Sequence, residues 1–398
     1  MAYIWCIGGG LMQVPVVEEI KKMGYMSIVS DGNKDCPCKN KADIFIHKDI
    51  FDIDGHLEES LGMEDTLVGV VAIGIDAPVT AARLAEKFGL PACETSTAEL
   101  IQNKYTLRKL QKFFGFHHPK FEHVEGQWGI NRIDKDLIIK PVLNSGSRGV
   151  TILKAGSTPM EAMRAVEKAR LASRDKCALV EERLYGTEHT VETLVDRHGV
   201  CHPCFITDRI FDYSNAALEK GLRHPSVLPR YVQASAYRLA SSMAKAFMLE
   251  STPLKLDIMV TENGIVAIEA TTRMSGGFDC QYLVPAATGK NLIRAGIEVA
   301  LGNDIPLECL DIKKNKVAVS NSLWPPEGII KSITGVKEAS KLEGVVKIIM
   351  SRKEGDFIEP YTDCAKRVCF VITVGNTYGE AMGVFEEVKN IIKIEVKQ

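Results

Sequence analysis

The segment from Leu254 to Ala270 alternates apolar and polar residues on either side of a Glu-Asn-Gly sequence. Such period-two alternation around a turn signal is typical of two strands joined by a hairpin. A three-residue loop, Glu262 to Gly264, gathers the apolar residues of both strands on one face. The same register sets Asp257 opposite Glu269, with their Cβ atoms about 5 Å apart. Because facing carboxylates repel, the pattern predicts a bound divalent cation or a lysine or arginine folded onto the pair.

The register rests on the choice between two turns. A two-residue Asn263-Gly264 turn would set Asp257 opposite Ala270 and mix charge with apolar residues on both faces. The three-residue loop, with Gly264 left-handed, pairs Val260 with Val266, Ile258 with Ile268 and Leu256 with Ala270. We therefore predict the three-residue loop, with Lys255 or Arg273 as the cation if no metal binds.

The first 100 residues alternate short apolar runs with helical patterns. The runs are residues 2–10, ending in Gly8-Gly9-Gly10, then 27–30, ending at Asp31, and 67–75, with helices through 14–20 and 81–88. This alternation predicts a parallel sheet covered on both faces, as in a doubly wound nucleotide-binding fold. The glycine run lacks the full dinucleotide spacing, and such a turn is common in any α/β layer.

After the first 100 residues, the pattern of predicted helices and strands changes at two points. Helical patterns begin at Ser96 and Asn103, and period-two strands follow at 136–140, 149–153, 178–182 and 189–195. We predict that these strands form a small antiparallel lid, and that a helix over 231–247 leads into the hairpin. From about Asp304 a third, smaller α+β region follows, with a helix over 380–391.

The amino-acid composition narrows the class of protein to which this chain can belong. The 398 residues are 45% hydrophobic, with a formal net charge of −2, which gives no basic excess for nucleic acid. No apolar run approaches 18 residues, and we expect a cytoplasmic protein without a membrane segment. The eleven cysteines are expected to be reduced, mostly core residues. The pairs Cys36/Cys38 and Cys201/Cys204 leave a zinc or redox half-site open, but neither has a partner pair.

One loop carries a phosphate-binding pattern. A strand delivers Lys140, and a turn containing Ser145, Gly146, Ser147 and Gly149 leads to the next strand. Backbone N–H groups and hydroxyls can surround phosphate oxygens while the lysine supplies charge. The alternative is a polar hairpin turn beside a surface lysine.

The order of these features resembles the ATP-grasp superfamily, over about residues 100–305, with the N-terminal layer similar to the domain that precedes the ATP-grasp core. The resemblance implies an ATP site in which Lys104 and Lys140 bind phosphates with Ser145, Gly146, Ser147 and Gly149. The sequence Glu181-Glu182-Arg183-Leu184 is similar to the family's hinge strand. Glu181 and the backbone of Glu182 and Leu184 would then hold the adenine, and Glu188 the ribose. Taken singly, Glu181 and Glu182 would be ordinary strand-end acids and Lys104 a solvated residue.

The resemblance also places one or two Mg²⁺ ions on Asp257, Glu269 and Thr271. The family has asparagine at the last position, so the threonine weakens one metal site. Arg273, Ser275, Gly276 and Gly277 would form the substrate end, with Arg273 and Lys140 as catalytic cations. Arg273 could otherwise simply pair with Glu269. His224 and Arg209 are weaker substrate candidates, with a solvent-exposed histidine and a surface ion pair as the alternatives.

These features predict an ATP-dependent ligase that joins a small-molecule carboxylate to an amine through an acyl phosphate. We expect a Rossmann-like domain over 1–100, an ATP-grasp domain over 101–305 with a lid over about 118–190, and a C-terminal domain over 306–398 similar to that of biotin carboxylases. A homodimer is expected from the resemblance alone. The alternatives are a carboxylase or carbamoylating enzyme that uses carboxyphosphate, and a nucleotide-binding protein without catalysis.

Overall fold

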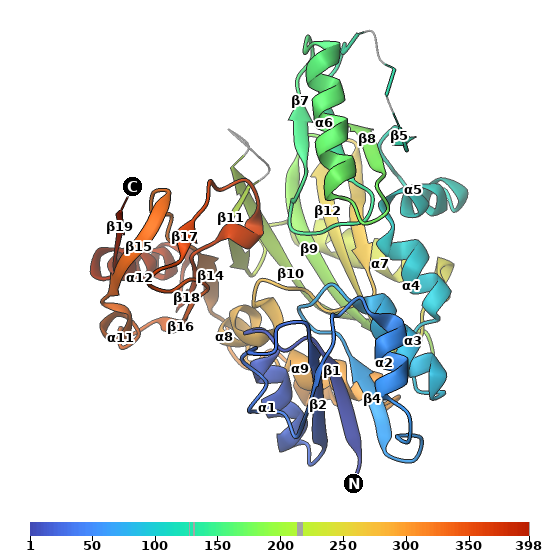
Figure 1. The fold of residues 1–398 in the computed structure, drawn as a ribbon, viewed down its shortest axis with the longest axis vertical. Helices are drawn as coiled ribbons and strands as arrows, with labels where there is room; N and C mark the ends of the chain where they lie inside the picture. Colours follow the sequence, from blue (N-terminus) through green and yellow to red (C-terminus); the bar gives the residue numbers. More distant parts are fainter. Residues whose placement is uncertain (127, 130–131, 213–217, 398) are drawn as a thin grey trace.

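The structure is a computed structural model that describes residues 1–126, 128–129, 132–212 and 218–397. Figure 1 shows an N-terminal α/β unit, a central sheet, a lid above it and a C-terminal unit to one side. The fold is the mixed α/β and α+β architecture that the sequence predicts. The exact limits of the three predicted domains stay a prediction, and residues 127, 130–131, 213–217 and 398 within them lie outside the described residues.

The N-terminal sheet is parallel, in the order β3-β2-β1-β4. Its strands are β1 (Tyr3–Ile7), β2 (Met26–Asp31), β3 (Ile44–His47) and β4 (Leu67–Val71), with helices α1 (Val14–Lys22), α2 (Ile53–Glu59) and α3 (Pro78–Lys87). Helix α9 (Leu292–Ala300) comes from much later in the chain and shares a buried core with β1 and α1. The predicted parallel sheet, covered on both faces, is confirmed, and α9 ties this unit to the rest of the protein.

The lid is an antiparallel sheet in the order β5-β8-β6-β7, backed by helix α6. Its elements are β5 (Phe121–Val124), β6 (Leu137–Pro141), β7 (Thr151–Leu153), α6 (Pro159–Ala172) and β8 (Ala178–Glu182). Thr158 and Glu161 form a reciprocal capping box at the start of α6, which fixes where this helix begins. Before the lid, α4 (Thr95–Gln102) is followed by Asn103, whose side chain caps α5 (Lys104–Phe113).

The central sheet has eight antiparallel strands in the order β13-β12-β9-β10-β11-β14-β18-β16. They are β9 (Thr187–Val195), β10 (Cys201–Asp212), β11 (Leu218–His224), β12 (Thr252–Thr261), β13 (Gly264–Thr271), β14 (Val317–Asn321), β16 (Val345–Met350) and β18 (Cys369–Gly375). Helix α7 (Arg230–Ala246) packs on the apolar face of β9, β10 and β12. The prediction that strand 189–195 belongs to the lid was wrong, because β9 pairs with β10 and β12 on both of its edges.

The C-terminal region extends the central sheet through the pairing of β11 with β14. A separate three-stranded sheet, in the order β17-β15-β19, completes it. The remaining elements are η1 (Asp279–Leu283), α8 (Val284–Thr288), α10 (Leu307–Leu310), β15 (Gly328–Thr334), α11 (Val336–Ala339), β17 (Phe357–Ile358), η2 (Cys364–Lys366), α12 (Tyr378–Ile391) and β19 (Lys393–Lys397). The helices predicted over 231–247 and 380–391 match α7 and α12 to within two residues at each end.

The β12–β13 hairpin sets Asp257 opposite Glu269 and Leu256 opposite Ala270, as predicted. The turn itself differs from the prediction, because Thr261 pairs with Gly264 and only two residues form the loop. Val260 consequently faces Ile265, and Ile258 faces Ala267. A bulge after Asp257 then shifts the register by one residue, and this shift restores the carboxylate pair.

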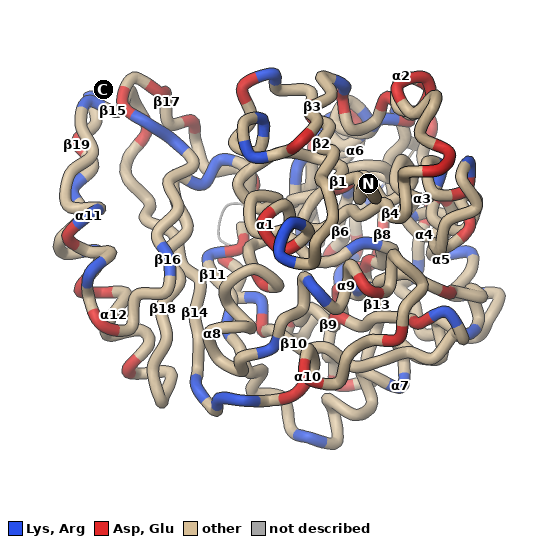
Figure 2. The backbone as a smooth tube through the Cα atoms, turned by 90° about the horizontal axis from the view of Figure 1, so that it is seen from below, with Lys and Arg blue, Asp and Glu red and all other residues tan. Residues whose placement is uncertain are grey.

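Charged residues of both signs are interspersed along the backbone in Figure 2. All eleven cysteines are free, and eight of them are buried. In the part of the chain that the structure describes, no helix is both long and apolar enough to cross a membrane.

Candidate functional site

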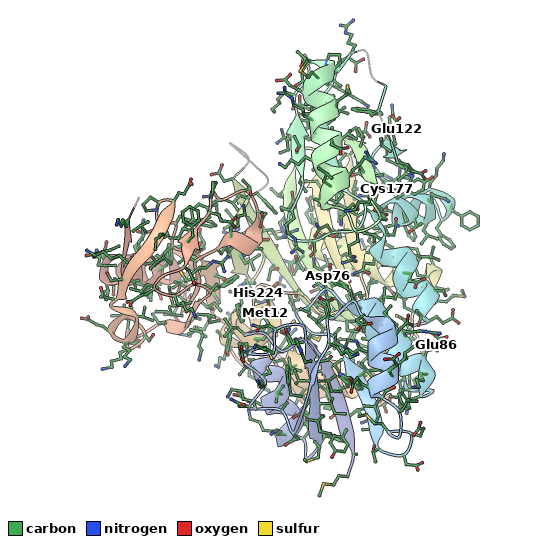
Figure 3. The ribbon with its side chains drawn as sticks, viewed as in Figure 1. Met12, Asp76, Glu86, Glu122, Cys177 and His224 are labelled. Carbon is green, nitrogen blue, oxygen red and sulfur yellow. The ribbon has the colours of Figure 1, made fainter. Side chains whose placement is uncertain are left out.

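A cavity of about 420 Å³ lies where the N-terminal unit, the lid, the central sheet and the C-terminal unit meet. Its wall is formed by the glycine loop, the carboxylate pair, the loop after β13 and the segment around η2. The charged lining residues are Asp76, Arg148, Arg209, Glu219, Lys255, Asp257, Glu269, Arg273, Asp279 and Arg367. Figure 3 draws Met12 and Asp76, which both line the cavity, at the end of the N-terminal unit that faces the central sheet. The cavity is large enough for a small molecule.

A second, smaller cavity of about 110 Å³ adjoins the first beneath the lid. The two cavities share Ser145, Gly146, Arg148, Arg209 and Glu269. Lys104, Lys140, Ser147 and Glu188 line only the smaller one. The structure thus brings both predicted phosphate lysines and the glycine loop to one space that opens onto the carboxylate pair.

The glycine loop has an unusual backbone. Gly146, Ser147 and Gly149 all have positive φ, at 66°, 61° and 76°. A Cβ on Gly149 would lie 2.5 Å from the Ala172 Cβ atom, so only glycine fits where the loop passes α6. The loop also contacts the C-terminal unit, because the Cys364 N–H donates to the Gly146 carbonyl oxygen over 3.2 Å. The C-terminal unit therefore supports the loop that we expect to bind phosphate.

Lys140 does not stand free at the end of β6. Its Nζ atom lies 2.7 Å from Glu181 Oε2, and the other oxygen of Glu181 accepts from Arg108 Nε over 2.6 Å. Arg108 also donates to the carbonyl oxygens of Ala267 and Ile268 on β13. Burial lowers the pKa of Lys140, which the Glu181 carboxylate partly offsets. Burial alone would raise the pKa of Glu181, but Arg108 and Lys140 outweigh it and hold that pKa below its ordinary value.

Each member of the carboxylate pair has its own cation. The Lys255 Nζ atom lies 2.6 Å from Asp257 Oδ2, and Arg209 approaches the same oxygen to 3.0 Å. Lys104 Nζ lies 2.8 Å from Glu269 Oε1. Burial alone would raise the pKa of Glu269, but Lys104 and Lys255 outweigh it and hold that pKa well below its usual range. The repulsion is therefore relieved by lysines, as the metal-free alternative predicts.

The donor set still fits Mg²⁺. This ion is usually bound through one or two carboxylates and completed by water and substrate phosphates, so it does not need an all-protein cage. Asp257 and Glu269 supply two carboxylates on the wall shared with the glycine loop. Among the described residues, no group of three or more His, Cys, Asp or Glu side chains could hold a metal by itself.

Thr271 does not lie at the cavity, where the resemblance predicts a metal ligand. It lies opposite Lys255 on β13, and its side chain is buried, but it does not line either cavity. Its hydroxyl has no hydrogen-bond partner within the described chain. The structure thus groups the two carboxylates at the cavity and leaves the threonine behind them.

The loop after β13 forms the far wall. Arg273, Ser275, Gly276 and Gly277 all line the large cavity, as predicted for the substrate end. Arg273 does not pair with Glu269; its guanidinium group donates to the Met274 carbonyl oxygen and lies 3.9 Å from Asp76. The Ser275 N–H donates to Glu192 Oε2 over 2.9 Å, which fixes the start of the turn.

Two predicted substrate residues have different outcomes. Arg209 lies within β10 rather than at a strand end, and its ion pairs with Glu188, Glu219 and Asp257 place it between the two cavities. His224 closes β11 and is buried, with Nδ1 3.0 Å from the Ile206 carbonyl oxygen. It lines neither cavity, so its predicted substrate role is not supported. Burial lowers the pKa of His224 to about 4.

The hinge residues lie at the edge of the lid. The Glu182 N–H donates to the Lys120 carbonyl oxygen, and its carboxylate accepts from the Lys120 N–H and from Lys135. Neither Glu182 nor Leu184 lines the two cavities. Their adenine contacts stay a prediction.

Sequence reasoning missed several residues of the site. Arg108, Thr190, Glu192, Glu219, Asp279 and Arg367 all touch the groups described above or line the cavity. Glu192 and Thr190 alternate with apolar residues along β9, and this pattern could have marked the polar face of the strand. Arg367 and Glu219 come from elements far apart in sequence, and no local signal joins them.

Comparison with known proteins agrees with this geometry. The ATP-grasp domain family matches residues 133–281. In solved structures, the fold is similar to an L-amino acid ligase from Bacillus licheniformis, with a TM-score of 0.84 and 19% identity over 100% of this chain and 99% of that one. It is also similar to a phosphoribosylglycinamide synthetase from Anaerococcus prevotii, with a TM-score of 0.78 and 18% identity over the whole of both chains.

The chain therefore contains an ATP-grasp domain and is an enzyme, and its overall fold is similar to that of ligases and of a biotin carboxylase domain. More particularly, residues 322–397 match the L-amino acid ligase C-terminal domain 2. A short stretch of 46 residues is 48% identical to an N5-carboxyaminoimidazole ribonucleotide synthase from Staphylococcus epidermidis. That match spans only 12% of this chain and 12% of the relative.

Proposed function

We propose that this enzyme uses ATP to join a carboxylate to an amine, with release of ADP and phosphate. The observation that carries the proposal is the shared wall of the two cavities, which places the glycine loop, the Asp257–Glu269 pair and the Arg273 loop around one space. The match of residues 322–397 to an L-amino acid ligase domain favours amide formation over carboxylation.

ATP would lie with its phosphates in the smaller cavity. Lys104 and Lys140 supply charge, and the part of the glycine loop from Ser145 to Arg148, which lines this cavity, supplies N–H groups. Both oxygens of Glu181 are already bonded, so we assign this residue to orienting Lys140 and Arg108 rather than to holding adenine by its side chain. The adenine would contact the backbone of Glu182 and Leu184, with the ribose toward Glu188.

Mg²⁺ would be held by Asp257 and Glu269, and it would neutralise phosphate charge when bound. Lys104 and Lys255, which now hold these carboxylates, lie where they can turn toward the phosphates or the substrate instead. Thr271 lines neither cavity, so the two carboxylates alone would supply the protein's ligands to the metal.

The reaction would run in two steps. An oxygen of the substrate carboxylate attacks the γ-phosphorus of ATP, the bond to the bridging oxygen breaks, and ADP leaves with that electron pair. Arg273, on the wall beside the pair, stabilises charge on the transferred group. The amine nitrogen then attacks the acyl carbon, phosphate leaves, and the nitrogen gives up a proton to form the amide. The contact between the lid loop and Cys364 helps to exclude water, which would hydrolyse the acyl phosphate.

The test is ADP release with Mg²⁺ and ATP, measured against paired panels of acids and amines, with mass spectrometry of the products. The proposal predicts ADP release that needs both an acid and an amine, and a product lighter by one water than their sum. ADP release that needs bicarbonate instead would indicate the carboxyphosphate alternative. Tight ATP binding without ADP release under any pair would indicate a nucleotide-binding protein without catalysis.

A further inference from the structure

Unpartnered buried polar atoms gather at one place in the protein. Among the described residues, eight buried side-chain nitrogen or oxygen atoms have no hydrogen-bond partner. Six of them belong to the segment 271–281 and to the facing Glu192: they are in Glu192, Thr271, Thr272, Arg273, Asp279 and Gln281. A buried polar atom without a partner destabilises the folded state, so native proteins rarely cluster such atoms without a role. Two of the six residues, Arg273 and Asp279, line the large cavity, and they point to a ligand on this wall.

Asp279 stands out because, of the two acids in this cluster, it is the one that lines the large cavity. Its side chain is only 2% exposed, and its Oδ1 atom has no hydrogen-bond partner. The other acids on the wall are already paired with cations. Asp76 lies near Arg273, Glu219 binds Arg209 and Arg367, Asp257 binds Lys255 and Arg209, and Glu269 binds Lys104.

A purely structural role for Asp279, the first residue of η1 after the N-cap Phe278, would be to bind the free N–H groups at the start of this short helix. A capping carboxylate accepts hydrogen bonds from backbone N–H groups in the first turn. The structure shows no such bond for Asp279, and its Oδ1 atom is one of the unpartnered atoms. Capping therefore does not account for a buried carboxyl group at this position.

We propose that Asp279 binds the ammonium group of an α-amino acid substrate in the large cavity. The proposal rests on the ligase function above and names the substrate class of that site. An ammonium group is a compact cation with three donors, which suits a single carboxyl group on an enclosed wall. Arg273, six residues earlier on the same wall, supplies the cation for the carboxylate of the same molecule. The apolar wall residues Met12, Leu222 and Phe370 leave room for an apolar side chain.

The electrostatic surroundings of Asp279 agree with this assignment. Burial raises the pKa of Asp279 well above its usual range, and the nearby Glu219 and Glu192 raise it further. This shift favours the neutral form of the carboxyl group, and an ammonium group beside it would offset the cost of its ionisation.

The test compares each α-amino acid with its des-amino counterpart in wild-type protein and in Asp279→Asn. Wild type should favour the amino acid by about 100-fold in kcat/KM for ADP release, because a site built for an N–H donor leaves a buried group unpaired with the analogue. In Asp279→Asn that preference should fall to within about threefold, with the KM for ATP unchanged. Thermal unfolding of Asp279→Asn and of Glu298→Gln, a buried acid on α9 paired with Arg294, controls for stability.

Each outcome decides the proposal. Retention of the amino-acid preference by Asp279→Asn would overturn it, as would equal turnover of the amino acid and its des-amino analogue by wild type. If wild type releases no ADP with any pair, the ligase function fails, and calorimetric titration of the same amino acids with Mg²⁺ and a non-hydrolysable ATP analogue tests Asp279 separately. Binding that Asp279→Asn abolishes would support the assignment, whereas no binding or unchanged binding would refute it.

Discussion

Asp257 lies directly opposite Glu269 across β12 and β13, and a different lysine holds each carboxylate. Lys255 comes from the same strand as Asp257, whereas Lys104 comes from the start of α5, about 150 residues before the hairpin. The pair is therefore stable without a metal and still open to the cavity. Binding of Mg²⁺ with ATP would replace the lysine contacts of the two carboxylates by metal contacts. The same lysines could then bind the phosphates.

Asp257→Asn should lower Mg²⁺-dependent ADP release by at least about 100-fold, because it removes one of the two carboxylates and leaves Lys255 without its anion. ADP release across a Mg²⁺ titration checks this. The exposed Asp304, which pairs with Arg197 at the surface, offers a matched Asp304→Asn control that should leave turnover unchanged. Unchanged turnover in Asp257→Asn would refute the metal assignment.

Arg108→Lys should destabilise the protein by about 3 to 5 kcal/mol. The guanidinium group is fully buried, and it joins Glu181 to two carbonyl oxygens of β13. Lysine cannot reproduce this planar set of donors. Urea unfolding measures the loss, and Arg238→Lys on the exposed face of α7 should change stability by less than about 0.5 kcal/mol. Equal stability of the two variants would contradict the network.

Gly149→Ala and Gly146→Ala should separate two effects in the glycine loop. Both residues have positive φ, so each change costs about 1 kcal/mol of backbone strain. Only the Cβ of Gly149→Ala meets other atoms, at Ala172 and Pro141. We expect Gly149→Ala to weaken ATP binding at least tenfold more than Gly146→Ala in calorimetric titration. A larger effect at Gly146 would contradict the packing described here.

Glu192→Gln should stabilise the protein at high pH. Burial raises the pKa of Glu192 to about 7, although Ser275 opposes the shift, whereas the unfolded carboxyl titrates near 4.5. Between these two values the folded state keeps a proton that the unfolded state has lost, so the free energy of unfolding falls as pH rises. The fall amounts to about 3 kcal/mol by pH 8. The glutamine variant lacks this proton, so it should match wild type near pH 4.5 and exceed it at pH 8.

Parallel unfolding curves of wild type and Glu192→Gln between pH 4.5 and 8 would contradict the buried, protonated state of Glu192. The same curves measured for Glu298→Gln provide the control for loss of a buried carboxyl group.

Local sequence patterns predicted much of the fold, because strands, helices and hairpins are determined mainly by residues that are close together in the sequence. The Asp257–Glu269 pair follows from alternation along two adjacent strands, and the parallel N-terminal sheet follows from the repeated strand and helix signals. The prediction of the hairpin turn was wrong because the bulge after Asp257 has no clear sequence signal. Strand β9 was assigned to the lid because its alternation does not say which strands it pairs with.

Residues that act through distant contacts escaped prediction for a related reason. Arg108 lies in an amphipathic helix, where it looks like a solvated residue, and only the packing of α5 against β13 brings it to Glu181. Asp279 follows a glycine turn, and the cavity that it lines is formed by segments far apart in the sequence. His224 looked accessible in sequence, whereas β11 extends through it and buries it.

The central claim is that the substrate carboxylate attacks ATP. It is tested most directly with the acid that supports ADP release, labelled with ¹⁸O in both carboxyl oxygens. Our account predicts that the released phosphate carries one ¹⁸O atom and that the amide keeps the other. Unlabelled phosphate, released together with the amide, would contradict the acyl-phosphate route.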